Sequence, residues 1–451
     1  STYLAGNQTY QTITEYDDSV LQSNIAMLGF KVAVNGSLTR YNLVDQSIDE
    51  FYDTSGIDAS ASTNEQRVAS GSNFYYWGAS GSNPTGATST DTSVAGYTTL
   101  VLSAASGNIV VGSGGNVDVL AVGGGGSGGS DYAGGGGAGG LIYKTGHALT
   151  AQTYAWVTGG GGATSTAAGA GNNGADSTWT DAAATVEFTA KGGGAGSSES
   201  TGDPPAVIGG SGGGGNYGNN AGAAANQGSQ SGDSGTYGFG FAGGNGVNAP
   251  SNRPGGGGGA GAVGNNGAAD ASSVSGAGGV GKDYSSIFGT AVGDSGWFAG
   301  GGGGGGGGSS YQTAGAGGTG GGTAGSYQAV TAAGQANTGG GSGGCGNNSS
   351  YGSGAGGSGI ILLRYADGAF QTAADLTLQS TDVTAVAEPD FGEFVTLIEN
   401  AAGTATLNTD IKGYVSRDSG TTFTQGTLVD EGTWGTNKKV LGFHDLDISS
   451  Q

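Results

Sequence analysis

Charged side chains are scarce in this sequence, and basic ones are the scarcest. Lys and Arg number 12 against 34 Asp and Glu, the formal net charge is -22, and charged residues make up 10% of the 451 residues. Ordinary soluble proteins carry roughly 25%. Because phosphate backbones are bound by clustered Lys and Arg, the sequence argues against a nucleic-acid partner, and likewise against an anionic membrane surface.

Cysteine, histidine and long apolar runs are also lacking. Cys345 is the only cysteine, so no disulfide can form within the chain, and we expect it to be a small buried residue. His147 and His444 are the only histidines, which leaves little scope for a histidine-based triad or a zinc site. No apolar run reaches the roughly 18 residues of a membrane span. We therefore predict no enzyme activity, no metal, no cofactor and no membrane insertion.

Glycine is abundant instead. The chain has 106 glycines, and 87 of them lie between Gly112 and Gly359, with an unbroken run over residues 300–308. A flexible linker is the usual fate of such a segment. Aromatic residues interrupt this one regularly, for example Tyr132, Trp156 and Tyr217, and linkers do not need them. We therefore expect an ordered block.

Three known glycine-rich structures can be compared with this block. Collagen is excluded because there is no sustained Gly-X-Y register and only six prolines occur. The calcium-binding β-helix repeat has one near match, residues 243–248, without tandem copies. Extended helices of polyproline II type remain, with three residues per turn and no internal hydrogen bonds. Packed side by side, such polyglycine helices admit only glycine and must pair their backbone groups with neighbours.

β-strand signals flank the block on both sides. Before it lie short runs rich in β-branched residues, Tyr97–Leu102, Asn108–Val111 and Val117–Val122. The block closes on the apolar run Ile360–Tyr365. We expect Val117–Val122 and Ile360–Tyr365 to pair, so that the two ends of the glycine block start from one sheet.

The outer parts have ordinary composition. We expect a strand over Ile25–Val34 before the turn Asn35-Gly36, and a solvated acidic turn rather than a calcium loop over Asp45–Asp58. Strands expected over 394–398, 404–407, 411–415 and 421–428 suggest a small antiparallel sandwich that looks short of strands, either truncated or completed by a neighbouring chain.

The sequence thus predicts a mainly β fold with a lattice of polyproline-II-type polyglycine helices and a small C-terminal β-sandwich. Four regions are expected: an N-terminal attachment and assembly region over 1–70, a β region over 71–116, the glycine-rich domain over 117–366 and the C-terminal module over 367–451.

A family resemblance rests on the glycine block. The frame made by Val117–Gly126, Gly134–Ile142, Tyr154–Gly162 and Gly357–Tyr365 resembles the glycine-rich domain of tailed-bacteriophage fibres and related virion proteins, of marine phage type. The flanks are similar to such proteins through Asp45–Asp49 and Ala402–Asp410. The resemblance implies an extracellular virion protein that contacts other virion proteins. Fibrous phage proteins are usually trimers, so it also implies a homotrimer.

The function expected from this resemblance is a tail fibre or adhesin that binds a host-surface glycan or outer-membrane protein through loops on the lattice. Aromatic rings give contact area at low entropy cost. We expect the receptor-binding residues to be Tyr237, Phe239, Phe241, Trp297 and Phe298. Two alternatives stay open: these rings pack inside the lattice, or the protein is a non-adhesive head fibre or decoration protein.

One segment imitates a nucleotide-binding motif. Residues 276–282 match the first seven places of a phosphate-binding loop, but Asp283 stands where Ser or Thr must reach the magnesium. We therefore expect no nucleotide site. Paired carboxylates could build a glycosidase site, but the long β-helical repeats expected of phage glycosidases are missing.

Overall fold

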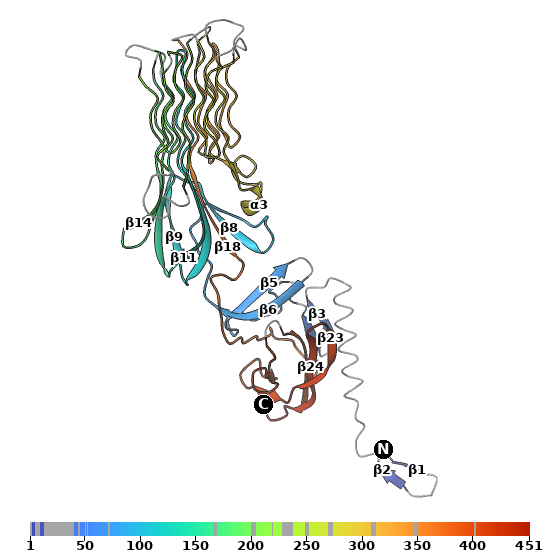
Figure 1. Cartoon of the computed structure of the whole chain (residues 1–451). Helices are drawn as coiled ribbons and strands as arrows, with labels where there is room; N and C mark the ends of the chain where they lie inside the picture. The colour runs from blue at the N-terminus through green and yellow to red at the C-terminus, as the bar shows by residue number, and fades with distance from the viewer. Residues whose placement is uncertain are drawn as a thin grey trace. The chain divides into compact units, whose positions relative to one another are not determined.

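The structure is a computed structural model of the whole chain (Figure 1). It describes residues 2–4, 10–12, 40–43, 46–49, 51, 53–70, 73–165, 169–199, 204–218, 220–227, 238–248, 252–268, 274–307, 313–346, 350–400 and 403–451. The chain divides into two compact units, Gly81–Thr372 and Ser1–Ser80 with Ala373–Gln451. The predicted mainly β fold is confirmed. The strand expected over Ile25–Val34 lies outside the described residues.

A six-stranded sheet forms the base of the unit Gly81–Thr372. Its order is β15 (Gly238–Phe239), β11 (Leu141–Leu149), β10 (Gly115–Val122), β18 (Ile360–Ala366), β8 (Tyr97–Leu102) and β7 (Ser89–Asp91). The expected pairing of the two bracketing strands is confirmed, because β10 and β18 are antiparallel neighbours with Val122 opposite Ile360. The strand predicted over Tyr97–Leu102 coincides with β8.

The two central strands, β10 and β18, are buried on both faces of the sheet where they pair, because Val119–Val122 and Ile360–Leu363 are apolar at every position. Successive side chains of a strand point to opposite faces. Val119 and Leu363 pack on one face with Trp179 and Phe188 from a second sheet. Leu120 and Leu362 pack on the other face. The second sheet has the order β14 (Val186–Ala190), β13 (Ser177–Thr180), β12 (Gln152–Val157) and β9 (Ser106–Val111).

The face of Leu120 and Leu362 is covered by the loop that holds the short helix α3 (Ser285–Phe288). Phe288 and Phe298 are fully buried there. Two short strands, β16 (Lys282–Asp283) and β17 (Trp297–Phe298), bracket the helix and pair with each other. The loop closes on the glycine block through Asp294, whose carboxylate accepts hydrogen bonds from Gly320 N and Gly321 N at 3.0 and 3.3 Å.

Extended glycine-rich segments run away from the two sheets and back again (Figure 1). In the segment 134–140, every third residue donates to the same neighbour. The amides of Gly134, Gly137 and Gly140 donate to carbonyls of 191–197 at 3.1, 2.8 and 2.7 Å. The amides of the intervening residues donate to two other segments, and the carbonyls of residues 133–140 accept from three more. The six neighbours are residues 123–129, 191–197, 211–214, 255–258, 302–305 and 339–342.

Glycine is required where these segments pass each other. A Cβ added at Gly136 would lie 2.2 Å from the carbonyl oxygen of Gly126, well inside contact distance. Gly160, on the outside, would meet nothing within 4 Å. The interior of the block is therefore backbone packed on backbone, and larger side chains fit only at its surface or its ends.

The other unit contains several small sheets. β5 (Glu65–Ser70) and β6 (Asn73–Ser80) form a hairpin, and β19 (Thr372–Ala373) lies beside β6. β20 (Phe391–Glu399), β24 (Lys438–Asp447) and β23 (Val429–Gly435) form a three-stranded sheet. Three two-stranded ribbons complete the unit: β1 (Thr2–Leu4) with β2 (Tyr10–Thr12), β3 (Arg40–Leu43) with β4 (Gln46–Asp49), and β21 (Gly413–Val415) with β22 (Thr424–Gly426).

The core of the C-terminal part is small, with Leu428, Leu441 and Phe443 as its buried centre. The strand predicted over Thr404–Leu407 is wrong. Leu407 makes only an isolated bridge to Ile411, because the chain turns there, with Asp410 N donating to Thr406 O at 2.8 Å.

Candidate functional site

The aromatic residues expected to bind a receptor do not form one site. Tyr237 lies outside the described residues. Phe239 is half-buried in β15, packs against the core of the six-stranded sheet, and has the Lys282 ammonium 3.8 Å from its ring centroid. Phe241, two residues further on, is 39% exposed. The accessible part of this first group is therefore Phe241.

Trp297 and Phe298 point in opposite directions because they are adjacent on a strand. Phe298 lies opposite Lys282 and is fully buried, so its ring is not available to a partner. Trp297 lies opposite Asp283 and is half-buried. Among the described residues of the five, Phe241 is exposed, and Phe239 and Trp297 are both half-buried. The ring of Phe239 already contacts the core and the Lys282 ammonium, so Phe241 and Trp297 are the better candidates.

A second aromatic group lies at the other end of the block, where segments that leave the sheets turn back. The turn between 123–130 and 134–140 carries Tyr132, and its ring centroid is 5.0 Å from that of Tyr217. The Tyr217 hydroxyl donates a hydrogen bond to the Glu199 carboxylate. This bond, together with desolvation, raises the pKa of Tyr217 to about 12.

The sequence analysis noted Tyr132 and Tyr217 only as interruptions of the glycine runs. Their position in the sequence could have indicated a chain reversal, because each tyrosine lies between two glycine-rich stretches that are long enough to form a pair of antiparallel segments. Rings at such reversals are placed at an end of the block and not on its wall. The half-buried pair offers two rings, a phenol hydroxyl and a carboxylate to a polar ligand.

The segment that imitates a phosphate-binding loop is one of the packed glycine segments. Its amides are already used: Gly276 N donates to Pro254 O, Gly279 N to Gly257 O, and Gly281 N to Thr319 O, all at 2.8–2.9 Å. A phosphate site needs free backbone amides turned toward the ligand. These amides cannot cradle a phosphate.

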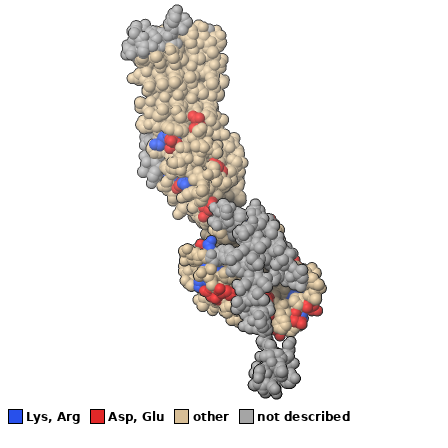
Figure 2. Space-filling view, turned by 90° about the vertical axis from the view of Figure 1, so that its right-hand side faces the viewer, with Lys and Arg blue, Asp and Glu red and all other residues tan. Residues whose placement is uncertain are grey.

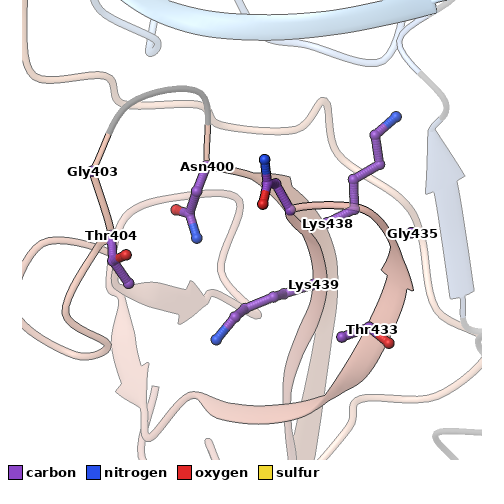
Figure 3. A pocket seen from close by; sticks show the side chains of 8 residues that line it. Asn400, Gly403, Thr404, Thr433, Gly435, Lys438 and Lys439 are labelled. Atoms are coloured by element: carbon purple, nitrogen blue, oxygen red, sulfur yellow. The ribbon is translucent and has the colours of Figure 1, made fainter.

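The C-terminal part carries a polar depression of about 460 Å³, lined by residues of two loops and of β23 and β24 (Figure 3). In Figure 3 Lys439 points toward the side of the depression on which Thr404 lies, whereas Lys438 extends the opposite way. Each lysine has a carboxylate beside it, Lys439 with Asp430 at 2.7 Å and Lys438 with Glu399 at 3.5 Å. The depression therefore offers hydrogen bonds without an excess of positive charge.

Among the described residues, no group of three or more His, Cys, Asp or Glu side chains could hold a metal ion. Within the predicted acidic turn Asp45–Asp58, the carboxylates of Asp49, Asp53 and Asp58 each accept the backbone N–H two residues on. Gln46–Asp49 is the strand β4, however, and residues 45 and 50 of the predicted turn lie outside the described residues. Within the described part of the chain, no helix is long and apolar enough to cross a bilayer. Cys345 is buried, as expected.

The wall of the glycine block is almost free of charge. No charged residue occurs between Asp294 and Arg364 in the sequence, and the face seen in Figure 2 shows no charged side chain on the described part of the block next to the grey atoms. Exposed valines follow two of its bends, Val263 at 54% and Val330 at 61% exposure. Contacts made by the wall therefore depend on hydrogen bonds and apolar surface and not on ion pairs.

Comparisons with known proteins agree with this architecture. No curated protein matches the chain. The family model described as a glycine-rich domain matches residues 103–366, from the end of β8 to the end of β18. Because this match covers more than half of the 451 residues, the protein belongs to the glycine-rich domain family.

Proposed function

We propose that this protein is a bacteriophage virion fibre protein of tail-fibre or adhesin type, in which a lattice of polyglycine helices presents loops to a host-surface receptor. The observation that carries the proposal is the backbone-only interior of the glycine block, in which one segment has six hydrogen-bonded neighbours. Among the described residues, such an interior is filled by backbone, and the exposed side chains lie on its surface and at its turns.

The polyglycine helices are supported by the period of the hydrogen bonds. A polyproline II helix has three residues per turn and no internal hydrogen bonds. Along 134–140 the partner segment repeats every three residues, which fits a threefold helix, whereas a flat strand alternates between two sides. The segments 123–130 and 300–306 follow the same period.

The receptor-binding residues that we propose are Phe241 and Trp297, from the first aromatic group, and the pair Tyr132 and Tyr217 at the opposite end. Aromatic faces stack on sugars and on apolar protein surface. The Glu199 carboxylate beside Tyr217 can accept hydrogen bonds from a polyhydroxylated ligand. A host-surface glycan or an outer-membrane protein fits this chemistry.

A non-adhesive virion component, such as a head fibre or decoration protein, is the second candidate. One observation favours it: Phe298 is fully buried, and Phe239 packs against the core. Two of the five residues expected to bind a receptor thus have a structural role.

Assembly is proposed to be homotrimeric, inside the virion and in contact with other virion proteins. The inner glycine segments already find six neighbours within one chain, so the block does not need a second chain to pair its backbone. The small C-terminal core, which we propose to be part of a β-sandwich, leaves Phe391 59% and Val386 81% exposed. That module is the better candidate for contacts between chains.

The test is binding of the fluorescently labelled full chain to a panel of bacterial surfaces, alongside immunogold labelling of phage particles. The adhesin predicts binding to a subset of the panel that is lost in Tyr132→Ala with Tyr217→Ala, or in Trp297→Ala, and kept in Val186→Ala, at a 52% exposed position of β14. Label at the tail tip supports the same function. Capsid label without cell binding supports the alternative, and no label on particles overturns both.

A further inference from the structure

Four asparagine–glycine pairs occur in the chain, and three of them lie at the surface of the glycine block: Asn173-Gly174, Asn245-Gly246 and Asn266-Gly267. The fourth, Asn35-Gly36, lies outside the described residues. In each of the three pairs the asparagine is exposed, whereas the glycine is buried or half-buried. A Cβ added at any of these glycines would lie 2.1 Å or less from a backbone oxygen. Close packing therefore requires glycine directly after each exposed asparagine.

The asparagine side chains complete the hydrogen bonding of neighbouring segments. Asn173 Oδ1 accepts a hydrogen bond from Ala195 N at 2.9 Å. Asn245 Oδ1 accepts one from Gly222 N, also at 2.9 Å. Asn266 Oδ1 accepts one from Asn245 N at 2.7 Å. Because every donor here is a backbone amide, the accepting atom of each side chain must be its carbonyl oxygen. The side-chain carbonyl of each pair is thus held in place.

The glycine amide of each pair is held as well. The three bonds are Gly174 N to Gly193 O at 2.9 Å, Gly246 N to Asn220 O at 3.0 Å, and Gly267 N to Asn245 O at 2.9 Å. Asparagine deamidates when the nitrogen of the following residue loses its proton and attacks the side-chain carbonyl carbon. Asparagine followed by glycine is especially prone to this reaction, because glycine has no Cβ to hinder the attack and a freely rotating backbone. In the folded block both reacting groups are tied to other segments.

We propose that these three pairs are deamidation sites that the folded glycine block protects, and that their conversion to isoaspartate after opening prevents the block from closing again. In the reaction the glycine nitrogen bonds to the asparagine Cγ, and the side-chain NH2 leaves with a proton as ammonia. The product is a five-membered succinimide. Water then opens this ring at one of its two carbonyls, which gives aspartate or isoaspartate. Local opening supplies the reactive state, since protein segments open with free energies between zero and that of global unfolding.

The two products should differ in their effect on the block. Aspartate keeps the backbone length and an acceptor oxygen, so it can replace asparagine. In isoaspartate the chain runs through the side-chain carbon, and the backbone gains one CH2 group. Gly246 and Gly267 are buried among backbone atoms of other segments, and an interior packed this densely has no space for an added group. The inference is independent of the proposed receptor binding, because it uses none of the aromatic residues.

The first test compares deamidation of the native full chain with that of the same chain in guanidinium chloride, at mildly alkaline pH. Mass-spectrometric peptide mapping assigns the product to each asparagine separately. A synthetic peptide of residues 243–248 gives the unprotected rate in both buffers. We expect each of the three asparagines to react at least about tenfold more slowly in the native chain than in the denatured chain. Equal rates in the two states, or no deamidation in denaturant, would overturn the proposal.

Point variants link the protection to packing of the block. In Gly136→Ala, where the new Cβ meets a backbone oxygen, the three rates and the amide hydrogen exchange of the same segments should rise together. Gly160→Ala, where the Cβ meets nothing, is the matched control and should leave them unchanged. Faster hydrogen exchange without faster deamidation in Gly136→Ala would contradict the protection.

A refolding experiment tests the consequence of the modification. The parent chain, aged in denaturant and then diluted, should refold in a yield that falls as isoaspartate accumulates at the three sites. A triple variant with Asn173→Gln, Asn245→Gln and Asn266→Gln keeps the amide oxygens but cyclises far more slowly, so ageing should not lower its yield. The corresponding triple Asp variant should refold as the fresh parent does, and fresh samples set the reference yield of each chain. Full refolding of parent chains that carry isoaspartate, or an equal loss in the Gln variant, would overturn this part of the proposal.

Discussion

Val122 and Ile360 lie opposite each other at the end of the pairing between β10 and β18. The whole glycine block separates them in the sequence, so its first and last segments leave from adjacent points of one sheet. Gly359 continues this contact, since a Cβ there would lie 2.1 Å from the Val122 carbonyl oxygen. The sheet therefore sets the starting position of the packed segments, and the stability of the two parts is coupled.

Truncating a core leucine of this sheet should destabilise the glycine block as well. Leu362 is fully buried opposite Leu120, and Leu362→Ala should lower the free energy of unfolding by about 2 to 5 kcal/mol. Amide hydrogen exchange of the glycine segments should accelerate in parallel. The control is Val330→Ala at an exposed position, with a change within about 0.5 kcal/mol. Faster exchange confined to the sheet would disprove the coupling.

Alanine should distinguish inner from outer glycines. In Gly136→Ala the new Cβ would lie 2.2 Å from a backbone oxygen, which cannot move without displacing a whole segment. We expect a loss of about 3 kcal/mol or more, comparable with overpacking in a dense core. In Gly160→Ala the Cβ meets nothing, so stability should be unchanged or rise by up to about 1 kcal/mol. Denaturant unfolding measures both, and equal effects would contradict the close packing.

The sequence predicted the sheet well, because its information lies in side chains. Val117–Val122 and Ile360–Tyr365 are continuous apolar runs bounded by glycine, and their position at the two ends of the block indicated that they pair. The partners within the block could not be predicted. Glycine has no side chain, so nothing in residues 300–308 distinguishes one neighbouring segment from another. Trp297 and Phe298 show a similar limit: both are aromatic, but only the strand register shows that one is buried.

The hydrogen bond from Tyr217 to Glu199 should be visible in a titration. The phenol pKa is raised from 10.0 to about 12, so the neutral ring is favoured in the folded protein. The stabilisation is therefore fully present below pH 10 and is lost as the pH rises toward about 12. The difference in tyrosinate absorbance between the parent and Tyr217→Phe should titrate near pH 12. In the Glu199→Gln background the midpoint of this titration should move back toward pH 10. A midpoint already near pH 10 in the parent would rule out the hydrogen bond.

Asp418 should make the stability of the unit that contains the C-terminus fall at low pH, whereas Tyr217 makes stability fall at high pH. The backbone N–H of Thr422 and the Ser416 hydroxyl donate to its carboxylate, both at 2.8 Å, and hold its pKa at about 2, below the usual 3.8. Because the folded pKa is lowered, the stabilisation is present above pH 4 and is lost as the pH falls toward about 2. Asp418→Asn lacks this charge, so the stability difference between the parent and the variant should shrink over that interval. Thermal unfolding at a series of pH values measures the difference.

Asp367→Asn serves as the control. A stability difference between the parent and Asp418→Asn that stays constant from pH 5 to pH 2 would show that these hydrogen bonds do not stabilise the charged carboxylate.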